Sequence, residues 1–523
     1  MSKIEVDQID PQSGTTLTLG TSGDTVVIPS GVSLAPGGGL TLTGDFVVDG
    51  GTIKLDGNYP TGTNNVALGD GALDDGSLSG ASNTAIGSAA LTANTSGANN
   101  VALGYLSLFD NTTGNNNIAL GRSALQCNTT ASGNTAVGYQ SLLANTTGCR
   151  NVALGSFALD SNTTGNNNAA IGYRALCDNT TGSNNVAVGF DALLCNSTGS
   201  ANTAIGYNAG GNLTTGTNNI AIGCGSLQAN TTASGNTAVG LQSLNANTTG
   251  VTNVAIGQSS LKTNTTGVNN TAVGKDSLFN STTASANTAV GKDSLLANTT
   301  GANHTAMGVS ALCANTTGSN NTGIGYLVLR ATTTGADNTG LGTASGLDVT
   351  TGSNNLLLGH DAGRTGSPGG IVTTASNIIV LGDENISNAH IQVDWTVASD
   401  QRDKTDFNNL DLGLDFVNKL NPVTYKWDKR IKYVSHEDRE TTNLNTVVND
   451  GTHKEDWLDI GFKAQEVEAL EIEAGYNKDN KTNLTVDISE DGKQYGIQYA
   501  KFVPILVNAI KELKARIEVL ENE

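Results

Sequence analysis

Carboxylate pairs are the first chemistry to look for in this chain, because polysaccharide hydrolysis needs two acidic side chains roughly 5 to 10 Å apart. Before residue 399 the acidic residues are sparse and recur in no paired pattern. Asp276 and Asp293 occupy equivalent positions of a repeated segment, but no glutamate accompanies them. These residues give little support to polysaccharide hydrolysis, and we expect no enzyme that turns over a substrate.

Thiol and metal chemistry has little support. The six cysteines are Cys127, Cys149, Cys177, Cys195, Cys224 and Cys313. They occupy different phases of the repeat, and no CxxC or Cys/His cluster is present. We therefore expect no metal and no cofactor, and unpaired cysteines indicate synthesis in a reducing compartment.

Charge limits the partners. The formal net charge is −20, and the repeats contain no cluster of Lys or Arg, so we expect no nucleic-acid partner. No stretch is apolar enough for a signal peptide or a bilayer span, so no membrane insertion is expected. An anionic cell surface repels an acidic rod at long range, which favours uncharged sugars as the receptor.

The composition changes after Ala398, where 17 of the 27 Lys and Arg residues lie. Three strings stand out there: ASDQRDKTDFNNLDLGLDFVNKLNPVTYKW from Ala398, DIGFKAQEVEAL from Asp459, and YGIQYAKFVPILVNAIKELKARIEVLENE from Tyr495. Together they resemble, over residues 399–523, the C-terminal intramolecular chaperone of phage tail fibres and tailspikes, which is the endosialidase-type self-cleaving peptidase.

The resemblance implies a site at the start of this segment. The family opens with Ser-Asp-x-Arg-x-Lys, which is matched here by Ser399, Asp400, Arg402 and Lys404. It implies that Ser399 is the nucleophile, that Lys404 completes a Ser-Lys dyad, and that the chain is cut once, in cis, between Ala398 and Ser399.

A second string, Gly-Phe-x-Ala-Gln-Glu, also matches the family and adds Gln465 and Glu466 as supporting residues. The implied chemistry is sound, because a lysine can deprotonate a serine if burial lowers its pKa from about 10.4 toward neutrality. A serine and a lysine five residues apart are, by themselves, usually solvated surface. The surrounding motif carries the assignment.

The chain before this site contains a strict repeat. A motif of the form Asn-x-Ala-(Val/Ile/Leu)-Gly, with substitutions in the last copies, recurs 18 times from Gly69 to Gly359, and every step after the first is 17 residues. Such regularity predicts a stack of identical coils joined by parallel β pairing. The Asn four before the glycine occurs in 17 copies, with His304 as the exception. We interpret it as a hydrogen-bonded turn ladder rather than a sugar-binding stripe.

Each repeat is expected to hold two short strands. One is Asn-x-Ala-Val-Gly, and the other contains Ala or Ser followed by Leu, four residues after the glycine in 15 copies. The Leu should point inward, with the Val or Ile before the glycine adding to the core. The Ala and Ser positions predict a second face that another chain can approach closely.

A coil this thin cannot stabilise a monomeric rod well, so we expect a homotrimer. The last helix supports this, because Val503, Leu506, Ile510, Leu513, Ile517 and Leu520 alternate by three and four residues, as in a coiled-coil seam. The repeats also resemble the heads of trimeric autotransporter adhesins, which form left-handed parallel β-rolls. The strings that carry this resemblance are NNVALG at Asn64–Gly69 and NTAIG at Asn202–Gly206.

The fold class is therefore mainly β: a trimeric parallel β-solenoid of 17-residue repeats, followed by a small α+β domain that ends in a coiled-coil helix. The expected segments are 1–60, a β segment for virion attachment; 61–365, the repeat shaft; 366–398, a transition; and 399–523, the chaperone and auto-peptidase.

The expected function is a structural phage tail fibre, made in the host cytoplasm and located in the virion, that contacts other tail proteins and a glycan receptor on the host. The alternative is a tailspike depolymerase that degrades the surface polysaccharide of the host. Ice binding by the Thr residues is disfavoured, because they lie in Gly-flanked turns of variable phase.

Overall fold

The computed structural model describes residues 63–392, 397–435, 438–439 and 441–522. The chain divides into two units, Met1–Leu55 and Asp56–Glu523, and all the described residues belong to the second. The strands expected in residues 1–60 lie outside the described part. Among the described residues, no helix is long and apolar enough to cross a bilayer.

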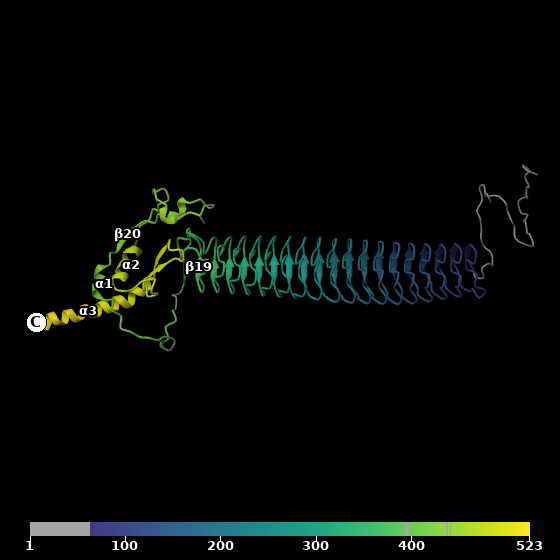
Figure 1. Cartoon of the computed structure of the whole chain (residues 1–523), viewed down its shortest axis with the longest axis horizontal. Coiled ribbons are helices and arrows are strands. Elements are labelled where there is room, and N and C mark those ends of the chain that lie inside the picture. Colours follow the sequence, from purple (N-terminus) through teal and green to yellow (C-terminus); the bar gives the residue numbers. More distant parts are fainter. Residues whose placement is uncertain (1–62, 393–396, 436–437, 440, 523) are drawn as a thin grey trace, which may run out of the picture. The chain divides into compact units, whose positions relative to one another are not determined.

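The shaft is a solenoid of nineteen three-residue strands, each parallel to the next (Figure 1). The strands are β1 (Val66–Leu68), β2 (Thr84–Ile86), β3 (Val101–Leu103), β4 (Ile118–Leu120), β5 (Thr135–Val137), β6 (Val152–Leu154), β7 (Ala169–Ile171), β8 (Val186–Val188), β9 (Thr203–Ile205), β10 (Ile220–Ile222), β11 (Thr237–Val239), β12 (Val254–Ile256), β13 (Thr271–Val273), β14 (Thr288–Val290), β15 (Thr305–Met307), β16 (Thr322–Ile324), β17 (Thr339–Leu341), β18 (Leu356–Leu358) and β19 (Ile379–Leu381).

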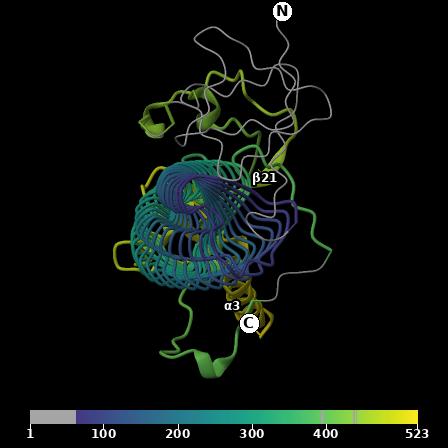
Figure 2. The same ribbon diagram turned by 90° about the vertical axis from the view of Figure 1, so that its right-hand side faces the viewer.

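The coils lie in register, because residues of the same phase pair. Ala119 of β4 pairs with Ala136 of β5, for example. Viewed along the stack, successive coils superimpose (Figure 2). The last pairing follows a longer connection, with Leu357 of β18 opposite Val380 of β19.

The core of the shaft consists of leucine and alanine. Leu193 and its counterparts four residues after the glycine are buried, as predicted. The apolar residue just before the glycine was expected in the core but lies outside, and the side chain of Leu103 is 45% exposed. Alternation along a strand explains this, since the middle alanine, such as Ala102, points inward and its two neighbours must point outward.

Two further expectations are corrected. The Ala and Ser three residues after the glycine, such as Ala124 and Ser107, are buried and form no outer face. The second strand of each repeat is a turn, in which Gln140 and Leu142 have φ angles of 52° and 55°. The turn still pairs between coils, for example from the Leu142 N–H to the Ala158 carbonyl at 2.9 Å, so no second strand is needed to satisfy its backbone.

The signature glycine is required by its neighbours as well as by its backbone. Gly138 has φ 136°, and a Cβ there would lie 2.6 Å from the carbonyl carbon and oxygen of Gly155 in the next coil. Only glycine, which has no Cβ atom, can adopt this conformation and also approach the next coil so closely.

Two buried asparagine ladders hold the turns. The Asn100 side chain accepts from the Asn117 N–H at 2.9 Å and donates to the Gly114 carbonyl at 2.9 Å, which confirms the predicted turn ladder. A second ladder is built from the asparagine of the Asn-Thr-Thr turns, with Asn111 donating to Asn94 at 2.9 Å. In the sequence, the Asn-Thr-Thr pattern indicates only turns.

Residues after the shaft form a small domain with mixed elements. These are η1 (Gln401–Asp403), α1 (Leu414–Lys419), β20 (Val423–Tyr425), η2 (Arg430–Tyr433), η3 (Leu444–Thr446), β21 (Asp459–Gly461), α2 (Ala464–Glu473), β22 (Val486–Ile488), β23 (Tyr495–Ile497), η4 (Tyr499–Lys501) and α3 (Phe502–Asn522). β20 pairs antiparallel with β21, and β22 with β23. The core contains Phe416 of α1, Val467 of α2 and Phe502 and Ile505 of α3.

Helix α3 has two distinct faces. Phe502, Ile505 and Ala509 are buried against the domain. The side chains that carry the three–four spacing, from Val503 to Leu520, are exposed instead. One chain therefore leaves this apolar seam uncovered.

Candidate functional site

A short turn joins Ser399 to Lys404. The 3₁₀ helix η1 (Gln401–Asp403) lies between them and bends the chain back on itself. The Lys404 Nζ comes within 2.6 Å of the Ser399 Oγ, which is hydrogen-bonding distance. A nucleophile and a base need this proximity before a proton can pass between them.

Asp400 and Arg402 build the turn. The Asp400 carboxylate caps η1 by accepting from the Arg402 N–H at 2.9 Å, and it pairs with the Arg402 guanidinium at 2.6 Å. The hydrogen bonds from Arg402 lower the pKa of Asp400. These two residues are engaged with each other, so they shape the loop that carries the dyad.

The dyad is assembled but not shielded. Ala398, Ser399 and Lys404 are all exposed in the single chain. A lysine acts as a base only without its proton, and removal from water is what favours that form. The described residues of the single chain do not supply this burial.

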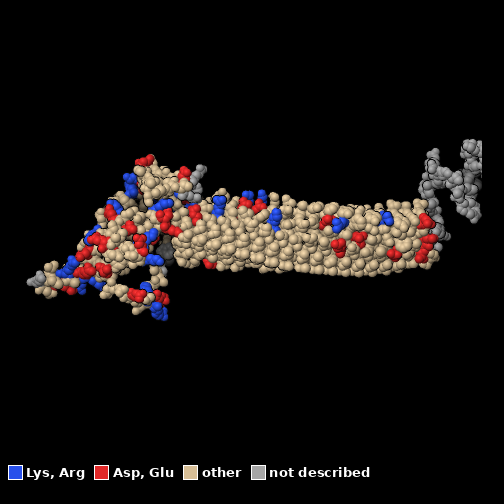
Figure 3. All heavy atoms as spheres, in the orientation of Figure 1, with Lys and Arg blue, Asp and Glu red and all other residues tan. Residues whose placement is uncertain are grey.

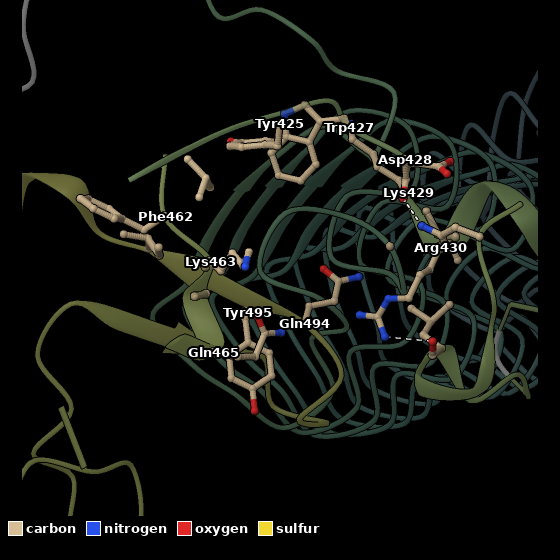
Figure 4. Close-up of a pocket in the computed structure, with 18 of the residues that line it drawn as sticks. Tyr425, Trp427, Asp428, Lys429, Arg430, Phe462, Lys463, Gln465, Gln494 and Tyr495 are labelled. Carbon is tan, nitrogen blue, oxygen red and sulfur yellow. Dashed lines mark hydrogen bonds between the residues drawn. The ribbon is translucent and has the colours of Figure 1, made fainter. Parts of the chain in front are cut away.

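The other two predicted residues lie elsewhere. Gln465 and Glu466 are in the first turn of α2 (Ala464–Glu473), where Glu466 pairs with Lys463 at 2.6 Å. Gln465 lines a cavity of about 740 Å³, which neither Ser399 nor Lys404 lines (Figure 4). The structure therefore brings together the first four motif residues and leaves the later two at a separate place.

The polar groups around this cavity are largely engaged. Arg430 donates to the Lys493 carbonyl at 2.7 Å and to the Leu444 carbonyl at 2.9 Å. The Trp427 indole N–H donates to Asp459 at 3.2 Å. Burial, together with the charge of Asp459, raises the pKa of Tyr425. These contacts hold the walls of the cavity together, and they form no nucleophile–base pair.

The carboxylates considered for polysaccharide hydrolysis are paired with lysines. Asp276 lies 3.7 Å from Lys275, and Asp293 lies 2.6 Å from Lys292. On the face seen in Figure 3 charged side chains are sparse along the shaft and dense over the residues that follow it. Nothing in this arrangement resembles an acid–nucleophile pair.

The six cysteines are free thiols. Burial, reinforced by the charge of Asp178, raises the pKa of Cys177 to about 12. Because the thiolate is the reactive form, this residue is held inert.

Sequence reasoning missed a charged cluster where the last coils meet the domain. The Arg439 guanidinium lies 2.8 Å from Glu384 and 3.5 Å from Asp361, and Arg364 lies 3.0 Å from Asp361. The sequence contains one signal of this cluster: charged residues appear in the repeat where Gly363 replaces its usual leucine. The partner Arg439 is too distant in sequence for any local pattern to indicate.

Comparison with known families gives one match. Residues 399–476 match the family model described as the chaperone of endosialidase. No curated protein matches the chain. The matched region begins at Ser399, includes the whole Ser399–Lys404 turn and reaches through α2, so this part of the segment after the solenoid is similar to the endosialidase chaperone family.

Proposed function

We propose that this chain is a phage tail fibre or tailspike-like protein whose C-terminal domain directs the folding of a trimeric shaft and is then removed by its own Ser-Lys dyad. The observation that carries the proposal is the start of the family match at Ser399, which follows the solenoid and lies 2.6 Å from the Lys404 amine. The folding helper and the fibre are thus joined through the candidate cleavage turn.

Two uncovered apolar surfaces support trimer formation. On the shaft, the outward rows of the strands carry exposed Val, Ile and Leu side chains, among them Val101 and Leu154. On α3, the seam from Val503 to Leu520 is exposed in the same way. Contiguous exposed apolar rows of this kind are typical of interfaces between chains.

The proposed cleavage follows from the dyad. The Ser399 Oγ attacks the Ala398 carbonyl carbon while the Lys404 Nζ takes its proton. The Ala398–Ser399 C–N bond then breaks, the released amine of Ser399 takes a proton, and water hydrolyses the resulting ester. The products are residues 1–398 and 399–523.

Intact-mass measurement after native expression tests the cleavage. The wild type should give the two products, and Ser399→Ala or Lys404→Ala should give one full-length chain that still trimerises. Ser387→Ala and Lys426→Ala are matched controls at exposed positions, and both should be cut normally. A single full-length mass for the wild type would show a chaperone without peptidase activity, and a cut in Ser399→Ala would identify another nucleophile.

A row of aromatic side chains supports a glycan receptor. The rings of Tyr139, Phe157, Tyr173, Phe190 and Tyr207 follow one another with centroids 5.2 to 6.0 Å apart. Only 4% of the residues are aromatic, so this concentration on one side of an almost uncharged shaft is notable. All five rings offer apolar contact area, and the three tyrosines add a polar hydroxyl at the tip.

Binding of the purified fibre to an array of bacterial surface polysaccharides tests this part of the proposal. We expect Tyr173→Ala with Tyr207→Ala to weaken retention, while Tyr326→Ala, an exposed tyrosine outside the row, leaves it unchanged. Equal retention of all three proteins would remove the row from receptor binding. We further propose that residues 1–60 attach the fibre to other tail proteins in the virion.

A further inference from the structure

The Asn-Thr-Thr-type turns of the shaft share one kind of contact, in which one to three N–H groups of a turn donate to a single carbonyl of the next coil. The N–H groups of Thr95, Ser96 and Gly97 all donate to the Thr112 carbonyl of the next coil, at 3.0, 3.1 and 3.2 Å. The hydroxyl of Thr95 adds a fourth bond to that oxygen at 3.0 Å. Each coil thus relies on the following coil to satisfy its turn.

The last turn of the shaft is completed by a side chain. The N–H groups of Thr373, Thr374 and Ala375 donate to one oxygen, Oε2 of Glu490, at 3.0, 3.3 and 3.4 Å. The Thr374 hydroxyl and N–H contact the other oxygen, Oε1. The carboxylate therefore takes the place that a threonine or serine carbonyl of the following coil occupies in the earlier turns.

The carboxylate is held in position by its own loop. Glu490 lies in the hairpin between β22 (Val486–Ile488) and β23 (Tyr495–Ile497). The hairpin is closed by the Ser489 N–H bonding the Gln494 carbonyl at 2.9 Å, and by the Ser489 hydroxyl bonding Asp491 at 2.6 Å. Burial opposes ionisation of Glu490, but the hydrogen bonds from Thr374 and Thr373 outweigh it and bring its pKa to about 2.

A second contact from the same domain identifies the correct coil. Arg439 reaches Asp361 and Glu384, which follow their glycines at the same offset in the last two coils. The earlier acidic residues at this offset, Asp191, Asp276 and Asp293, lie beside Arg174, Lys275 and Lys292 of the shaft itself and not beside a side chain of the domain. Arg439 therefore distinguishes the end of the shaft from the similar turns before it.

We propose that Glu490 is the template on which the shaft starts to fold. Its carboxylate replaces the main-chain carbonyl of a coil that the shaft lacks, so coils add from β19 toward β1. The inference rests on the proposed chaperone function and names the residue that performs it. Ordering the first coil is the costly step of such a stack, because later coils each find a finished neighbour.

The template matters during folding and is dispensable afterwards. The Glu490 side chain stays partly exposed to solvent, and the contact involves one turn of nineteen coils. Removal of residues 399–523 would therefore leave the other turn contacts of the shaft intact. This fits a helper that is needed once.

Refolding of the full-length Glu490→Gln chain from denaturant, compared with wild type, tests the template. The amide keeps the size of the side chain but removes the charge and turns an NH₂ group toward N–H donors. We expect about tenfold slower formation of the shaft, as for the loss of an interaction already present in the rate-limiting state. Glu521→Gln, exposed near the end of α3, should refold like wild type.

Three further measurements make the outcome decisive. Emission from Trp427 and Trp457, both within the C-terminal domain, should show that this domain still folds in Glu490→Gln. Pulsed hydrogen exchange should protect residues 356–381 before residues 66–137 in the wild type. The melting temperature of the released 1–398 shaft should be the same whether it comes from the wild type or from the variant.

Wild-type refolding kinetics in Glu490→Gln, or earlier protection of the N-terminal coils, would overturn the template. Deletion of residues 399–523 separates this result from failure of the chaperone itself. If the deleted chain folds as well as the full chain, the proposed function fails. If the deletion abolishes folding and Glu490→Gln does not slow it, only the template fails.

Discussion

The shaft and the domain that follows it are built in opposite ways. In the shaft each side chain meets copies of itself in the coils before and after, as in the ladder through Asn100 and Asn117. In the domain the contacts are unique, such as Glu512 accepting from the Leu414 N–H at 2.7 Å. Identical coils can pair in any of several registers, whereas unique contacts allow only one, so the two regions need each other to produce one structure.

Disrupting the seam of α3 should have the largest effect, because it removes the unique part of the system. Ile510→Asp with Leu513→Asp places two charges in the apolar row, and we expect loss of both trimer and cleavage. Analytical ultracentrifugation and intact mass measure the two outcomes. Lys511→Asp with Ala515→Asp adds charges at exposed positions outside the seam and should change neither. A trimer that survives the seam substitutions would show that the shaft assembles without α3.

A buried charge in the shaft should have the next largest effect. Leu193→Asp introduces an unpaired carboxylate at a side chain that is 2% exposed, and should destabilise the shaft by about 3 to 5 kcal/mol. Thermal unfolding followed by circular dichroism measures it. Leu241→Asp, at a leucine that is 46% exposed and lies outside the strands, is the matched control and should cost much less. An unchanged melting temperature for Leu193→Asp would contradict the inward register.

The smallest effect is expected at the one position where the asparagine ladder contains another residue, and this effect on the stability of the shaft should depend on pH. The buried His304 accepts from the Asn321 N–H through Nδ1 at 3.2 Å, and burial lowers its pKa below the usual 6.5. The unfolded chain therefore takes up a proton at a higher pH than the folded one. Stability should be complete above about pH 6.5 and fall as the solution becomes more acidic.

His304→Asn sharpens this test because it restores the residue found at every other copy of this position. The variant should match the wild type at pH 7.5 and exceed it by about 1 kcal/mol at pH 5, where protonation would leave a buried N–H facing another donor. Urea unfolding at the two pH values measures the difference. His390→Asn, at an exposed position, is the control and should leave the pH dependence unchanged. A wild-type shaft equally stable at both pH values would contradict the prediction.

The parts of the fold that repeat could be predicted, because each copy reinforces the same signal. The inward Leu193 and the ladder through Asn100 were both recoverable from the strict spacing. The spacing did not predict that the residue before the glycine points outward. Alternation along a strand separates its side chains into two faces, but it does not say which face lies inside the coil. Nor does sequence mark a leucine such as Leu142 for the left-handed conformation that turns the expected second strand into a loop.

Some residues of the site could likewise be predicted from the sequence, and others could not. Ser399 and Lys404 are five residues apart, so a recognised motif was enough to single them out, and their contact is local. Glu490 lies 116 residues from Thr374, and Arg439 lies 78 from Asp361. Contacts at that range depend on how the whole domain folds, and no pattern in the chain indicates them.

The dependence of each coil on its immediate neighbours alone has a genetic consequence. Whole repeats can be gained or lost by recombination between near-identical segments of coding sequence, with no change at either end of the shaft. Each gained repeat would lengthen the shaft by about 4.8 Å, the spacing of paired strands. The length of the shaft could therefore change in evolution through the number of repeats, while the segments before and after the shaft stay the same.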